Sequence, residues 1–162
     1  MRRTISSRIS RNRGSISTPN SAGGAAAGGE PTLREELERA SSGLVYSSES
    51  DRPFEFFSLR YPGKRGSPDG TEFARLVGAF PEARVQVRSI DEFFARHTTT
   101  SDPYDSESQH IRPRYEELVR VLSRHLRDVK VYRIGRIEIA CYVVGLDGDG
   151  NLAGLKTVAI ET

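Results

Sequence analysis

The 162 residues of this chain include one cysteine, one methionine and no tryptophan. Because Cys141 is alone, the chain can form neither an intrachain disulfide nor a metal site built from several cysteines. No run of about 18 apolar residues is present, which excludes a membrane-spanning helix. A Gly-rich phosphate-binding loop and a nucleophile elbow are also absent. The lack of motifs that carry chemistry favours a binding protein over an enzyme.

Acidic residues are missing from residues 1–29, which carry five arginines. The whole chain has 24 basic and 22 acidic residues and a net charge of +2. Without those five arginines, residues 30–162 contain 19 basic and 22 acidic residues, so this part has a net charge of −3. An acidic domain disfavours nucleic acid through its long-range field. We therefore expect no membrane partner, and nucleic-acid binding only through residues 1–31.

Residues 1–31 are rich in Ser, Arg and Gly and poor in apolar side chains. Such a segment buries too little apolar surface to offset the entropy of ordering, so we expect a disordered tail over 1–31 and one domain over 32–162. The Arg-rich start resembles a transit peptide, but no secretory apolar stretch follows. The expected compartment is the cytoplasm. The periplasm stays open as the alternative, because proteins without disulfides occur on either side of a membrane.

Apolar residues at helical spacing predict helices over 33–43, where Gly43 ends the first, and over 73–80, 90–97 and 112–127. Two capping boxes, Thr32 to Glu35 and Ser89 to Glu92, mark the starts of the first and third helices. The second has its stripe at Phe73, Leu76, Val77 and Phe80. The buried face of the fourth is expected to contain Tyr115, Leu118, Val119, Leu122 and Leu126.

Strands are predicted over 44–46, 53–61, 84–88, 130–135 and 136–146, followed by a last strand that runs to Thr162. Residues 147–151 are typical of a hairpin turn, and the calcium-loop alternative fails because Leu152 and Val158 occupy its required Gly and Glu positions. The last two strands are largely apolar on both faces, so the sheet needs cover on both sides. The predicted fold is α+β, a three-layer α/β/α sandwich around a mixed, mostly antiparallel sheet.

The predicted last strand would hold the α-carboxylate of Thr162 at a fixed place on the edge of the sheet. Such a carboxylate can accept hydrogen bonds or ligate a hard metal ion. The alternative is that the strand completes the core and its terminus is inert.

The histidines (His97, His110 and His125) lack metal-ligand spacing, and we expect His97 to be packed or to end its helix. Cys141 is expected in the core rather than as a nucleophile.

Several short motifs occur in a characteristic order and spacing: 40–44, 48–50 followed by 53–55, 90–94, 98–99, 131–135, 150–155 and the end at Glu161-Thr162. With these motifs, residues 33–162 resemble the nuclease A inhibitor family, which inhibits a sugar-nonspecific DNA/RNA endonuclease. The resemblance implies an α/β/α sandwich, a 1:1 complex with such a nuclease, and no cofactor of the chain's own.

The resemblance also implies which residues bind the nuclease. The terminal carboxylate of Thr162 would reach the catalytic Mg²⁺ of the partner, and Glu49 in an acidic loop would add polar contacts. A third family contact is an aromatic residue, but the corresponding position here is Pro103, with Tyr104 beside it as the candidate substitute. The competing hypothesis, based on the Arg-rich tail and the replaced aromatic, is a non-enzymatic adaptor or nucleic-acid-associated domain that has lost the inhibition.

Overall fold

An antiparallel five-stranded sheet forms the centre of the computed structural model, which describes residues 30–62, 65–99 and 104–162. Its strands, in spatial order, are β3 (Glu55–Arg60), β7 (Asn151–Ile160), β6 (Glu138–Leu146), β5 (Arg127–Ile134) and β4 (Val85–Arg88). The C-terminal strand β7 is therefore an interior strand between β3 and β6. The prediction was a mixed, mostly antiparallel sheet, and all of the described pairings are antiparallel.

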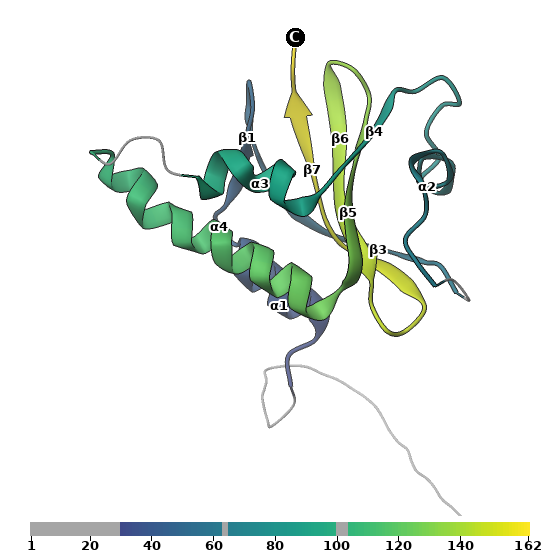
Figure 1. Ribbon diagram of the computed structural model, residues 1–162, viewed down its shortest axis with the longest axis horizontal. Helices are drawn as coiled ribbons and strands as arrows, with labels where there is room; N and C mark the ends of the chain where they lie inside the picture. Colours follow the sequence, from purple (N-terminus) through teal and green to yellow (C-terminus); the bar gives the residue numbers. More distant parts are fainter. Residues whose placement is uncertain (1–29, 63–64, 100–103) are drawn as a thin grey trace, which may run out of the picture. The chain divides into compact units, whose positions relative to one another are not determined.

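Helices lie on both sides of this sheet (Figure 1). On one side are α1 (Leu33–Ser41), α3 (Ile90–Thr98) and α4 (Ser106–His125), and on the other is the short α2 (Gly70–Leu76). A small hairpin of β1 (Val45–Ser47) and β2 (Asp51–Pro53) forms a separate two-stranded sheet. The predicted α+β class is confirmed, and the arrangement is compatible with three layers. Leu33–Thr162 form one compact unit, and most of the predicted tail, residues 1–29, lies outside the described residues.

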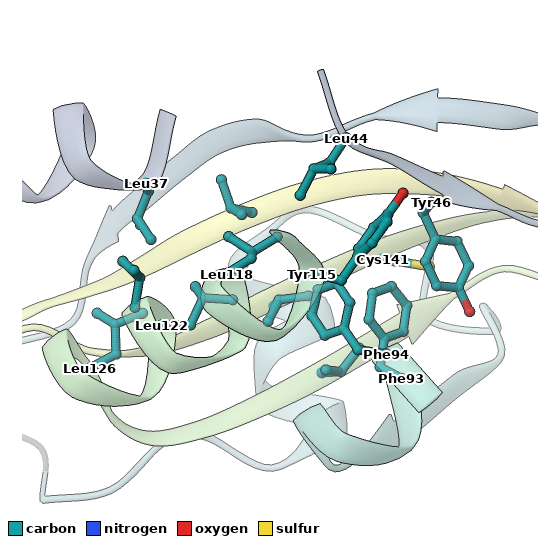
Figure 2. Packing of buried hydrophobic residues seen from close by; sticks show 14 of the residues in the cluster. Leu37, Leu44, Tyr46, Phe93, Phe94, Tyr115, Leu118, Leu122, Leu126 and Cys141 are labelled. Carbon is teal, nitrogen blue, oxygen red and sulfur yellow. The ribbon is translucent and has the colours of Figure 1, made fainter. Parts of the chain in front are cut away.

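Two apolar clusters pack against the two faces of the sheet. The larger one joins α1, α3 and α4 to the sheet through residues such as Leu37, Phe94 and Leu122 (Figure 2). The smaller one lies under α2 and includes Phe73, which stacks on Tyr132 with ring centroids 4.1 Å apart. Both faces of β6 and β7 are thus apolar and covered, as their sequences predicted.

Several helix boundaries differ from the prediction, and the start of α4 and the end of α2 differ most. α4 begins at Ser106 rather than at 112, because Asp105 caps it: its side chain accepts from the Glu107 amide (3.2 Å) and its carbonyl from the Gln109 amide (3.1 Å). Pro113 consequently lies inside the helix.

α2 ends early, at Leu76. Gly78 has φ +79°, and Gly78 and Ala79 donate to the carbonyls of Arg75 and Ala74 in a Schellman-type ending. The predicted stripe is therefore cut short, and Phe80, 80% exposed, lies beyond the helix.

Candidate functional site

The end of the chain meets the tip of the β1–β2 hairpin. The sequence motifs indicated that Glu49 lies in an acidic loop; since Ser47 pairs with Asp51, this loop is the tip of a tight hairpin. The amide of Thr162 donates to Glu49 Oε2 (2.7 Å), and its hydroxyl donates to Glu49 Oε1 (2.8 Å). Figure 1 shows this hairpin and the chain end at the same end of the sheet. The structure thus brings together two residues that are 113 positions apart.

The approach of the hairpin to β7 is fixed by two further hydrogen bonds. The Glu49 amide donates to the carbonyl of Ile160 (3.1 Å), and the Ile160 amide donates to the hydroxyl of Ser48 (2.9 Å). On the opposite side, the Glu161 amide donates to the carbonyl of Ile137 (2.9 Å). β7 itself ends at Ile160, so the prediction that the strand runs to Thr162 was too long by two residues. Those two residues are nevertheless held by hydrogen bonds.

Glu49 and Thr162 come together at this exposed point. The bonds to Glu49 use the amide and the hydroxyl of Thr162, so neither occupies the terminal carboxylate. The amide hydrogen bond from Thr162, followed by that from its hydroxyl, holds the pKa of the Glu49 carboxyl below its usual range. Glu49 is therefore ionised at neutral pH. This arrangement suits a partner that offers cationic groups or a metal ion.

His97 supports the hairpin from α3. Its Nε2 accepts a hydrogen bond from the amide of Ser47 (3.3 Å), and its ring stacks on Tyr115 with centroids 4.2 Å apart. The neighbouring Arg96 donates to the carbonyl of Ser47 and lies over the ring of Tyr46, 5.1 Å from its centroid. The prediction that His97 is packed is confirmed, and it also lies in the last turn of α3. Its role is to anchor β1, which leads to Glu49.

The ionisation of His97 couples this anchor to pH. Burial, and after it the charge of Arg96, lowers the pKa of His97 from 6.5 to about 4, while Asp51 opposes the shift. Only the neutral ring can accept the hydrogen bond from Ser47 at Nε2. The anchor is therefore intact at neutral pH and is lost when the ring is protonated.

We expect this shift to make stability depend on pH between about 6.5 and 4. Because the folded pKa lies below the unfolded one, the contribution of His97 is fully present above about 6.5 and falls as the pH drops towards 4, by up to about 1.4 kcal/mol per pH unit. Urea unfolding at several pH values checks this against His97→Gln, with His110→Gln as the control. An unfolding free-energy difference between wild type and His97→Gln that stays constant over this range would contradict the assignment.

The profile of the nuclease A inhibitor-like protein family matches residues 31–162. The chain belongs to this family. A comparison with curated proteins finds no match. Membership points to nuclease inhibition as the function, as the resemblance of the sequence motifs implied.

Of the two residues predicted for the third contact, the structure describes only Tyr104. Pro103 falls outside the described residues, and Tyr104, 93% exposed, directly precedes the Asp105 cap of α4. Figure 1 shows the start of α4 well to the left of the chain end. The structure therefore brings Glu49 and Thr162 together, whereas Tyr104 lies beside the start of α4.

The remaining sequence candidates have structural roles. Cys141 is fully buried, and burial raises the pKa of its thiol, so it is a core residue as predicted. Nε2 of His125 lies 3.2 Å from a carboxylate oxygen of Glu36.

Within residues 30–62, 65–99 and 104–162, no group of three or more His, Cys, Asp and Glu residues is placed to hold a metal ion. In the same part of the chain, no helix has the length and apolar character needed to cross a membrane.

The sequence did not predict the roles of two residues at the site. The hydroxyl of Ser48 holds the end of β7, but Ser48 was noted only as a member of the motif at 48–50. Arg133 is an ion-pair partner of Glu161. The sequence does contain a sign of this role, because Arg133 is a charged residue within the apolar alternation of β5.

Proposed function

We propose that this protein inhibits a metal-dependent, sugar-nonspecific DNA/RNA endonuclease by inserting its C-terminus into the active site in a 1:1 complex. The observation that carries the proposal is the pair of hydrogen bonds from Thr162 to Glu49, which hold the last residue at an exposed end of the sheet. Family membership supports the class of partner.

The chemistry of the chain end suits such an active site. A nuclease of this class binds a substrate phosphate at Mg²⁺ among basic groups. A carboxylate is a hard anionic oxygen ligand, so the α-carboxylate of Thr162 can take the place of a phosphate oxygen. It offers no phosphodiester bond to cleave and therefore only blocks the site. The Mg²⁺ would belong to the nuclease, and Glu49 would accept charge-assisted hydrogen bonds from basic groups around it.

Preorganisation favours tight binding. A free C-terminal segment would lose conformational entropy on entering a cleft, whereas Glu161 and Thr162 are already held in the free protein. The net charge of −3 in residues 30–162 adds long-range attraction to a basic cleft. Tyr104, and Pro103 beside it, are the proposed third contact, because exposed aromatic rings often carry interface energy. Because Tyr104 precedes α4, which starts well away from the chain end, it would contact the nuclease outside its metal site.

A cleavage assay with a metal-dependent nonspecific endonuclease tests this function. The protein is titrated into a fixed concentration of enzyme well above the expected dissociation constant. We expect residual DNA cleavage to fall linearly and to reach its minimum at one inhibitor per enzyme. Unchanged cleavage at a several-fold excess of folded protein, repeated over a panel of such endonucleases, would contradict the proposal.

Replacing Glu49 by Gln is expected to weaken inhibition about 10- to 100-fold. The amide keeps one acceptor oxygen but places an NH₂ group against a donor of Thr162, and it removes the negative charge. Because Glu49 is exposed, the melting temperature should change little. Glu55→Gln removes the same charge from an exposed site on β3 and serves as the control. Equal inhibition constants for the two variants would argue against a specific role for Glu49.

A further inference from the structure

Arg133 is a charged residue on the buried side of the sheet. It lies on β5 two positions after Val131, so the alternation of the strand directs both side chains to the face covered by α3 and α4. Its side chain is only 11% exposed. A buried guanidinium costs free energy unless it is paired and hydrogen-bonded, so its partners indicate why it is there.

Those partners lie on either side of β5. Nη1 of Arg133 donates to the side-chain oxygen of Gln86 (3.0 Å), the residue that faces it on β4. Nη2 donates to the carboxylate of Glu161. Since β6 separates β5 from β7 in the sheet, the arginine reaches across one strand to the residue that follows β7. The planar fork of the guanidinium suits this double contact, which a lysine could not make in the same geometry.

The two last residues are consequently held from opposite sides. Glu161 is fixed by Arg133 through its side chain and by Ile137 through its amide. Thr162 is fixed by Glu49 of the hairpin. A single contact would leave the chain end free to rotate about the bonds between these residues, whereas contacts on both residues restrict its direction.

We propose that Arg133 is a positioning residue, which through Glu161 fixes the direction in which the terminal carboxylate of Thr162 points. The proposal rests on the proposed function for its purpose, since direction matters only if the carboxylate is presented to a partner. The simpler alternative is that the Arg133–Glu161 pair only stabilises the fold. The two roles differ in what they predict for the order of Thr162 in the free protein.

The double variant Arg133→Met/Glu161→Gln separates these roles. Removing both charges leaves no unpaired buried ion, and Met fills much of the space of the arginine stem, so the fold should persist. The thioether of Met offers no donor to the neutral amide that replaces the Glu161 carboxylate, so the restraint on the chain end is lost. The matched control is Arg120→Met/Glu117→Gln, which removes an exposed Arg–Glu pair on α4 with an N–O distance of 2.8 Å.

Order is measured by ¹⁵N relaxation of the Thr162 amide in the free protein. We expect the order parameter of this amide to be about 0.85 in the wild type and in the control, and below about 0.6 in the Arg133 double variant. The same variant should bind the nuclease about tenfold more weakly in Mg²⁺, with little change when the metal is chelated. The control should match the wild type under both conditions.

An unchanged order parameter in the Arg133 variant would overturn the positioning role. The positioning role would also be overturned if the wild type inhibits and the variant binds the nuclease in Mg²⁺ as tightly as the wild type does. The same holds if the variant loses affinity equally with and without metal. Failure of the wild type to inhibit any nuclease contradicts the proposed function instead. The relaxation measurement needs no nuclease, so the two failures are distinguishable.

Discussion

Extension of the chain by one glycine after Thr162 is expected to weaken nuclease inhibition by at least about 100-fold, or about 2.7 kcal/mol. The extension converts the α-carboxylate into a neutral amide carbonyl. It also moves the new carboxylate about 3.5 Å further along the chain, past the position that the contacts of Thr162 define. A loss of this size is typical of a central interface contact.

The fold should survive this extension. The hydrogen bonds of Thr162 to Glu49 use its amide and its hydroxyl, and both remain in the longer chain. The melting temperature should therefore stay within a degree or two of the wild type. A semisynthetic protein with an amidated Thr162 is the matched control, because it removes the charge without adding length. Full inhibition by the extended protein would rule out a metal contact by the chain end.

Replacing Gly154 by Ala is expected to have the largest effect on stability. Gly154 lies in the middle of β7 with φ +159°, paired with Val144 on β6 and Phe57 on β3. A Cβ atom there would stand 1.9 Å from the carbonyl oxygen of Val143 and 2.9 Å from the Cα of Val144. These are backbone atoms of the neighbouring strand, which cannot move away without breaking the hydrogen bonds between β6 and β7.

We expect the cost of this substitution to exceed about 4 kcal/mol, from overpacking and an unfavourable φ together. That is a large part of the total stability of an ordinary domain, about 5–15 kcal/mol, so the variant should be partly or wholly unfolded. Gly148→Ala is the control: its φ is +139°, but no atom lies within 4 Å of the new Cβ. Urea unfolding compares the two, and equal losses would show that the clash with β6 is relieved.

The elements of this fold that depend on local signals were predictable. The capping box at Ser89 forms as its sequence indicates: the Ser89 side chain accepts from the Glu92 amide (3.1 Å), and the Glu92 carboxylate accepts from the Ser89 amide (2.9 Å). Residues 147–151 form the turn between β6 and β7, where Asp147 accepts from the amides of Asp149 and Asn151. In both cases the interacting residues are within four positions of one another, so the sequence contains the whole interaction.

The site depended on non-local contacts that one sequence does not contain. Thr162 and Glu49 were each singled out, but their direct hydrogen bonds join positions 113 apart. The link between Arg133 and Glu161 follows from the strand order β7-β6-β5, which periodicity cannot supply. The early end of α2 was missed for a different reason: the apolar stripe continues to Phe80, but the left-handed Gly78 ends the helix before it.

Calorimetric binding to the nuclease, with Mg²⁺ and after chelation of the metal, tests the central claim that the chain end is presented to the nuclease metal. The natural chain is compared with one that lacks Thr162. We expect a 1:1 complex for the natural chain that is at least about 100-fold tighter in Mg²⁺ than without it, and weak, metal-independent binding for the shortened chain. Equal affinity of the two chains in Mg²⁺, with both folded, would contradict the account.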